Sequence, residues 1–217
     1  MRIRPRSTAP AVTLAAVLLL AGCGGSTGTE SAASTGEAPA SSSAAGSPSA
    51  SSAAPAPADS ADADAEAAAP AFPADTSADT SDAASPAGLT LTSVRTGSHD
   101  GYDRVVFEFA GSGTPGWRAE YVEGAVAQGS GDPIEVPGAA ILQLDLNGIS
   151  YPYETGATEV ARGPLAASGT DVVQGAFYDG TFEGVAVAWV GTAAETPFRV
   201  FALSNPTRVV VDVVHAP

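Results

Sequence analysis

Residues 24–88 most constrain what this chain can fold into, because they include no leucine, isoleucine or valine. They are rich in Ala, Ser, Pro and Asp, carry nine acidic residues and no basic ones, and have Phe72 as their only aromatic. Such a segment cannot bury enough apolar area to offset the entropy lost on ordering. We therefore predict a disordered linker over residues 23–88, either a tether or a plain spacer, and one folded domain at residues 89–217.

The first 22 residues have the layout of a signal peptide. Arginines occupy positions 2, 4 and 6, and residues 11–21 form an apolar run too short to cross a bilayer core of roughly 30 Å. The sequence Ala21-Gly22-Cys23 resembles the lipobox of bacterial lipoprotein precursors. In those precursors the signal is removed and the cysteine carries diacylglycerol, usually with an acylated N-terminus. The resemblance implies lipidation at Cys23 and anchoring to the extracytoplasmic face of the cell membrane; the alternative is an ordinary secretory signal with a chance cysteine.

Residues 89–217 are long enough for one domain with its own core. They contain six arginines, no lysine and fifteen acidic residues, a formal charge of −9, and no cysteine. The acidity argues against nucleic acid or an anionic membrane surface as partner. Without disulfides, the domain depends on packing for its stability.

Apolar and polar residues alternate with a period of two in this domain, which is the pattern of half-buried β-strands. The apolar side chains fall on one strand face in two segments: Val105, Phe107 and Phe109 in the first, Leu142, Leu144 and Leu146 in the second. Further strands are predicted at residues 117–123, 185–190, 198–203 and 208–214, and turns at residues 97–101, 111–116, 129–133 and 204–207. No stretch predicts a helix. We expect an all-β domain, a small β-sandwich rather than a closed sheet.

Two of these strands share a pattern of arginine, three apolar residues and an acid. Arg104 and Glu108 have this spacing in one strand, Arg208 and Asp212 in the other. Antiparallel pairing of the two strands would place Arg104 opposite Asp212 and Arg208 opposite Glu108. A local hairpin before Arg208 would place Arg199 opposite Asp212 instead. Either register joins opposite charges at about 0.2–1 kcal/mol a pair, so structural ion pairs are favoured over a ligand site.

Four blocks of the domain, taken in order, resemble the AMIN-like domain of actinobacterial lipoproteins: residues 101–109, 115–122, 181–184 and 197–212. The last block also resembles the closing strands of AMIN domains proper, with Leu203, Pro206, Arg208 and Asp212 in a Leu-x-x-Pro-x-Arg-x-x-x-Asp pattern. The resemblance implies a sandwich of two small sheets that lacks catalytic activity and localises envelope proteins by binding peptidoglycan. No catalytic domain follows residue 217, so we expect wall binding without delivery of an enzyme.

Residues that carry catalytic or metal chemistry are few. Residues 111–116 match a Gly-x-Gly-x-x-Gly fingerprint, but a strand follows where a dinucleotide site needs a helix, so we predict a turn. His99, Asp100 and Asp103 have ligand or acid–base chemistry, yet such a turn more often carries solvated groups, and a zinc site needs three or four ligands. His215 stands at the extreme end of the chain. We predict no metal, no cofactor and no enzymatic activity.

Ser130 lies in a glycine-rich loop without a histidine nearby in sequence, so nothing supports a catalytic triad.

The residues suited to binding are aromatic. Trp117 and Tyr121 share a strand face and either stack on sugar rings or, as is more usual for large aromatics, pack in the core. Residues 148–171, with Tyr151 and Tyr153, form either a long functional loop or a segment with one short strand. We take these four aromatics, with Arg104, as the candidate binding residues.

Three hypotheses follow for the function of the domain. The first is a membrane-anchored, non-catalytic envelope module that binds peptidoglycan or another wall component. The second is a module that docks onto another envelope protein through an exposed apolar patch. The third, a wall hydrolase, requires His99, Asp103 or Glu183 to converge in a pocket with other ionisable groups.

Overall fold

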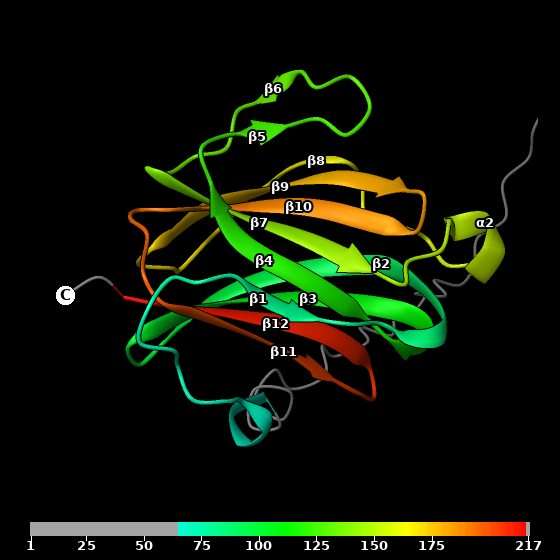
Figure 1. Ribbon diagram of the computed structural model, residues 1–217, viewed down its shortest axis with the longest axis horizontal. Helices are drawn as coiled ribbons and strands as arrows, with labels where there is room; N and C mark the ends of the chain where they lie inside the picture. The colour runs from blue at the N-terminus through cyan, green and yellow to red at the C-terminus, as the bar shows by residue number, and fades with distance from the viewer. Residues whose placement is uncertain (1–64, 216–217) are drawn as a thin grey trace, which may run out of the picture. The chain divides into compact units, whose positions relative to one another are not determined.

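The strands of this chain form antiparallel sheets, two of which pack face to face as a sandwich (Figure 1). The computed structural model describes residues 65–215. One sheet has six strands in the order β1-β4-β7-β10-β9-β8, the other four strands in the order β11-β12-β3-β2, and β5 pairs with β6. The strand bounds are β1 (Asp79–Ser81), β2 (Ala84–His99), β3 (Tyr102–Thr114), β4 (Gly116–Val122), β5 (Ala125–Val126), β6 (Pro133–Ile134), β7 (Ala140–Asn147), β8 (Gly163–Leu165), β9 (Val173–Phe182), β10 (Val185–Thr192), β11 (Phe198–Leu203) and β12 (Thr207–Val214). The predicted all-β sandwich is confirmed.

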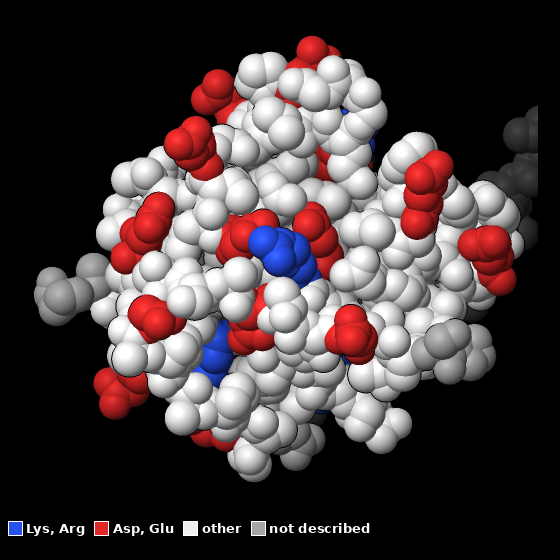
Figure 2. Space-filling model, in the orientation of Figure 1, with Lys and Arg blue, Asp and Glu red and all other residues white. Residues whose placement is uncertain are grey.

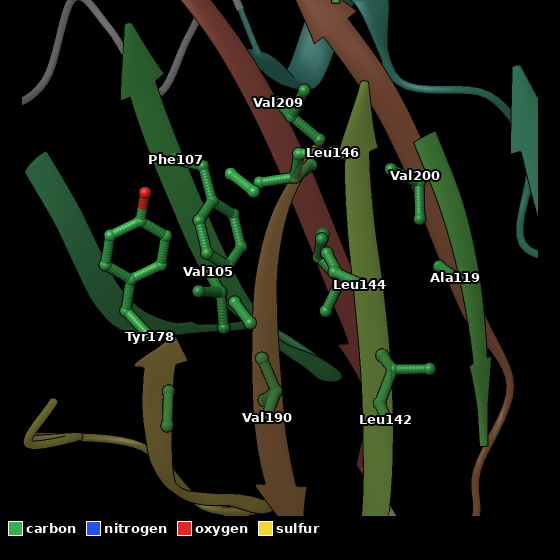
Figure 3. Packing of buried hydrophobic residues seen from close by; sticks show 14 of the residues in the cluster. Val105, Phe107, Ala119, Leu142, Leu144, Leu146, Tyr178, Val190, Val200 and Val209 are labelled. Carbon is green, nitrogen blue, oxygen red and sulfur yellow. The ribbon is translucent and has the colours of Figure 1, made fainter. Parts of the chain in front are cut away.

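The core lies between the two sheets and uses the alternating positions of the sequence. Val105 and Phe107 of β3, and Leu142, Leu144 and Leu146 of β7, are fully buried. Figure 3 shows side chains from both sheets meeting in this layer. Each such side chain stabilises the fold by roughly 1.5–3 kcal/mol.

The outer face of the six-stranded sheet is covered in part by the β5–β6 hairpin. Trp189 and Val187 of β10 are buried there and share a cluster with Ala125, against which Ile134 packs. The indole Nε1 of Trp189 donates a hydrogen bond to Gln143 Oε1 at 3.1 Å, which satisfies its one polar atom.

The outer face of the four-stranded sheet is covered by the residues that precede β1. We call residues 65–78 the N-terminal strap; its first four residues are helical. Ala65 is buried in a cluster with Phe201 of β11 and Val210 of β12, and Ala69 packs against that cluster. The same sheet thus contributes one face to the core and the other to the strap.

The predicted linker boundary is wrong for residues 65–88, which the structure describes as part of the fold. Residues 65–88 include β1 and the first residues of β2, and β1 pairs with β4 in the register Asp79↔Ala119 to Ser81↔Trp117. Composition did not predict β1 because this strand is held by backbone pairing and by hydrogen bonds to Asp79, and it needs no apolar side chains of its own. The predicted signal peptide, Cys23 and linker residues 24–64 lie outside the described residues.

Two connections differ in part from their prediction. Residues 111–114 continue β3 rather than turning, and β4 begins at residue 116, so this stretch carries the chain from the four-stranded to the six-stranded sheet. Residues 148–171 do contain a short strand, β8, together with the four-residue helix α2 (Pro152–Thr155). Among the described residues, no helix is long and apolar enough to cross a membrane.

Candidate functional site

A buried cluster of charge lies on the outer face of the four-stranded sheet. Because β12 is an inner strand between β11 and β3, Asp212 stands opposite Arg199 on one side and Arg104 on the other. Arg104 Nε and Nη2 donate to the two Asp212 oxygens at 2.7 and 2.9 Å, and Arg199 Nε donates to Oδ2 at 2.8 Å. The exposed fractions are 1% for Arg104, 7% for Arg199 and 0% for Asp212. The two registers that the sequence left open therefore occur together.

The charges in this cluster do not cancel within the sheet. Two guanidinium groups share one carboxylate, which leaves one positive charge in a site almost closed to water. The carboxylate of Glu66, from the strap, lies 3.6 Å from Arg104 Nη2 and supplies the second negative charge. Arg104 Nη1 is buried and has no hydrogen-bond partner among the described residues. Buried charge of this kind is costly unless it is compensated.

Aromatic rings enclose the same cluster. The guanidinium carbon of Arg199 lies 4.0 Å from the ring centroid of Phe72 in the strap and 5.2 Å from that of Tyr102. Phe201 lies 5.8 Å from the guanidinium carbons of both arginines. Cation–π attraction of this kind strengthens when the cation is shielded from water. Sequence reasoning singled out the arginines but missed these rings, although Tyr102 shares the face of Arg104 by simple alternation.

Tyr102 and Glu66 join the strap to the sheet by a hydrogen bond. The phenol donates to Glu66 Oε2 and accepts from Arg104 Nη2 at 3.2 Å. Burial, then the Glu66 hydrogen bond, raise the pKa of Tyr102 to about 12. The same bond is the main reason that the pKa of Glu66 is lowered, with the arginines contributing. The site as a whole favours a carboxylate next to a neutral phenol.

The other ion pair that the sequence predicts joins Arg208 and Glu108, and the β12–β3 strand register places these two residues opposite each other. The Glu108 carboxylate meets Arg95 Nη1 of β2 at 3.1 Å, and Arg208 Nε donates to the Pro206 carbonyl at 3.2 Å. Arg95 is half exposed, so its pair with Glu108 stabilises the fold only slightly.

Asp103 is the residue of the predicted 99–103 cluster with a defined role. Its Oδ2 accepts hydrogen bonds from the amides of residues 171, 172 and 173 at 2.6–2.8 Å. Its Oδ1 lies 2.9 Å from His215 Nε2. Burial opposes ionisation, but the hydrogen bonds of the loop and of His215 outweigh it and lower the pKa of Asp103. Asp103 thus ties the end of β12 to the loop before β9.

The same place contains the ligand types of a cation site. Asp103, Asp171 and His215 bring their ligand atoms within 4.8 Å of one another. Both oxygens of Asp103 are already engaged in the contacts just described, and Asp171 also accepts from Ser98 Oγ at 2.9 Å. His99, which the sequence grouped with Asp103, instead stacks on Tyr102 at 4.9 Å. The hydrogen bonds of Asp103 and Asp171 within the fold therefore explain why these three residues lie together.

Trp117 and Tyr121 do not form an exposed platform. Both are half-buried and pack against the core cluster beside Ala119. Trp117 Nε1 donates to Asp79 Oδ1 at 2.9 Å, and the Tyr121 hydroxyl donates to the Thr196 carbonyl at 3.0 Å. Of the two roles that the sequence allowed for Trp117 and Tyr121, the structure shows core packing.

Tyr151 and Tyr153 form a stacked pair in which Tyr153 is exposed and Tyr151 is half-buried. Their rings stack at 5.4 Å with an interplanar angle of 10°, and Tyr153 is 80% exposed. The hydroxyl of Tyr151 accepts a hydrogen bond from the Glu183 amide at 3.2 Å, which fixes α2 against the β9–β10 turn. Phe182 in the same turn is 53% exposed. We call Tyr151, Tyr153 and Phe182 the aromatic corner.

Two remaining candidates have ordinary surroundings. Ser130 caps its own turn by accepting the Asp132 amide at 3.3 Å. A shallow pocket between the end of β3 and the β11–β12 turn carries no titratable side chain; it is lined by Gly113, Thr114, Pro115, Ala202, Leu203, Ser204 and Thr207.

Comparisons with known proteins agree with this architecture at the level of the family. Neither the curated proteins nor the solved structures include a significant match to the chain. A family profile for the AMIN-like domain matches residues 89–215, from the buried β2 residue Leu89 to the Asp103 partner His215. The match covers more than half of the chain, which therefore belongs to the AMIN-like domain family.

Proposed function

We propose that this chain is a membrane-anchored, non-catalytic envelope protein whose AMIN-like domain binds peptidoglycan or another cell-wall component. The observation that carries the proposal is the aromatic corner, where the exposed ring of Tyr153 stacks on the half-buried ring of Tyr151 and Phe182 is also exposed. Flat aromatic faces suit the apolar faces of sugar rings, and a phenol adds a polar group for their hydroxyls. Family membership supports the same class of ligand through the resemblance to AMIN domains.

Anchoring rests on the sequence around Cys23. The lipobox resemblance predicts diacylglycerol on this cysteine, and lipidation of the N-terminus would add a second signal for stable membrane attachment. Metabolic labelling with an alkyne fatty acid tests this directly. We expect label on the chain and none on the Cys23→Ser variant; an unlabelled wild-type chain in the culture medium would refute anchoring.

The acidic surface disfavours negatively charged partners. Figure 2 shows acidic side chains spread over the visible face, with only small areas of arginine. A surface of this sign repels polyanions such as nucleic acid, whereas uncharged sugar units carry no such penalty.

The two other hypotheses have less support in the geometry. The protein-docking hypothesis needs a large exposed apolar patch, and the large hydrophobic side chains exposed among the described residues are Val126, Tyr153 and Phe182. The hydrolase hypothesis needs convergent ionisable groups. His99 stacks on Tyr102, Asp103 bonds to His215, and Glu183 contacts Tyr151 through its backbone amide.

Co-sedimentation of the purified chain with insoluble peptidoglycan tests the binding role. We expect the chain to sediment with the wall and the Tyr153→Ala, Phe182→Ala variant to remain mostly in solution. Val126→Ala is the matched control, because Val126 is 51% exposed but lies on the β5–β6 hairpin. Failure of the folded wild-type chain to sediment would refute wall binding; retention of the double variant would refute the aromatic corner as the site.

A further inference from the structure

The N-terminal strap contacts the charge cluster of the four-stranded sheet in the manner of a bound peptide. It offers the Glu66 carboxylate to Tyr102 and Arg104, and the ring of Phe72 to Arg199. Between these two residues, the carbonyl of Pro70 accepts a hydrogen bond from Arg199 Nη1 at 2.7 Å. The strap thus presents a carboxylate, a carbonyl four residues later and an aromatic ring six residues after the carboxylate.

The face that the strap contacts is formed by residues of the sheet itself. Arg104, Arg199, Tyr102 and Phe201 belong to β3 and β11, and Asp212 holds both guanidinium groups in place. Arg104, Arg199 and Asp212 together carry one net positive charge, and Arg104 Nη1 is buried without a hydrogen-bond partner among the described residues. Fixed arginine donors next to aromatic rings recognise a carboxylate with an adjacent apolar group.

The strap fills this face with few contacts of its own. Most of its residues are exposed, and the described ones include no Leu, Ile or Val. Ala65 is its one fully buried apolar side chain, and Glu66 keeps 60% of its side chain exposed. A segment held by so little apolar burial belongs to the least stable part of a fold, which opens while the rest stays folded.

We propose that the outer face of the four-stranded sheet is a binding site for a peptide segment that carries a carboxylate and, six residues on, an aromatic ring, and that the strap is the ligand occupying it in cis. A peptide of the same pattern competes with the strap for the site. This site is distinct from the aromatic corner and does not depend on wall binding.

A fluorescent peptide with the sequence of residues 62–76 tests the proposal by anisotropy. The unaltered chain should bind it weakly, because the site is open only for the fraction of time that the strap is released. The chain with Glu66→Gln and Phe72→Ala should bind it at least ten-fold more tightly. The matched control is Asp75→Asn, which removes a strap charge whose hydrogen bond within the described part of the chain is to the Ser77 amide, and it should leave the affinity unchanged.

Changes in the peptide keep the test independent of folding. Peptides with Glu66→Gln or Phe72→Ala should bind the opened chain at least ten-fold more weakly than the original peptide, and one with Asp75→Asn equally well. Equal binding of all four peptides, or no binding by an opened chain with a native circular dichroism spectrum, would overturn the proposal. Hydrogen exchange gives a second measurement on the unaltered chain: saturating peptide should speed exchange in residues 66–78 and leave β3 and β12 unchanged. An unchanged strap would refute displacement.

Discussion

Removal of the carboxylate shared by the two buried arginines gives the sharpest test of how the four-stranded sheet is held. Asp212→Asn keeps the shape of the side chain and one acceptor oxygen, but it leaves Arg104 and Arg199 without their anion. Loss of one partner from a buried ion pair costs about 3–5 kcal/mol. Because Asp212 is fully buried and serves two arginines at 2.7–2.9 Å, we expect a value near the upper end.

Urea denaturation followed by circular dichroism measures this cost, and Glu108→Gln is the matched control. It is the same acid-to-amide change on the same sheet, but Glu108 pairs with the half-exposed Arg95, so its loss should cost less than about 1 kcal/mol. In thermal melts the two variants should differ by roughly 4–20 °C, because their costs differ by about 2–5 kcal/mol and each kcal/mol shifts the midpoint by about 2–4 °C for a chain of this size. Equal destabilisation of both variants would refute the account of Asp212 as a buried, shared counter-ion.

Two further predictions concern a close backbone approach and the titration of a buried phenol. Gly111→Ala should destabilise the domain by about 1–3 kcal/mol more than Gly101→Ala, because both residues have a positive φ but a Cβ at Gly111 would lie 2.0 Å from the Gly88 carbonyl oxygen while the space at Gly101 is open; equal urea midpoints would contradict this. Tyr102 should titrate near pH 12 in the folded chain when followed by NMR of its ring carbons, and Glu66→Gln should move that pKa toward 10. Since the raised pKa favours the neutral phenol, the stability that Tyr102 contributes should be complete below about pH 10 and lost as the pH rises toward 12; a Tyr102 pKa near 10 in the unaltered chain would contradict the burial of its hydroxyl against the strap.

Strict alternation made the sandwich predictable, and interruptions of alternation hid part of it. In β3 and β7 the buried positions follow a period of two without a break. In β2, Leu89 and Leu91 point to the core, but an irregularity between Leu91 and Ser93 shifts the phase, so that Val94 is the next residue to pack there. In a bulge, two residues of one strand oppose a single residue of the partner strand, so the alternation changes phase and no longer predicts one continuous strand.

The sequence pattern predicted which charged residues pair across strands, but it did not predict the order of the strands in the sheet. The spacing of arginine and acid gave the two registers of Asp212, but it could not say that β12 is an inner strand with a partner on each side. Trp117 and Tyr121 share a face as predicted, yet which face meets the core depends on how β4 enters the sheet between β1 and β7. A one-dimensional pattern determines which residues share a face, whereas the sheet order determines what that face meets.

The strap was not predicted, because its composition indicates only that it contributes little to a core. Low apolar content argues against a core, and the strap indeed contributes little to one. What it contributes is negative charge. On the outer face of the four-stranded sheet, two buried guanidinium groups share the Asp212 carboxylate, so this cluster favours one more anion beside it. The strap carries acidic residues and no basic ones, and it supplies that anion through the Glu66 carboxylate, together with the Phe72 ring. The acidity of the strap therefore contributes to binding at this cluster through Glu66 as well as to solvation.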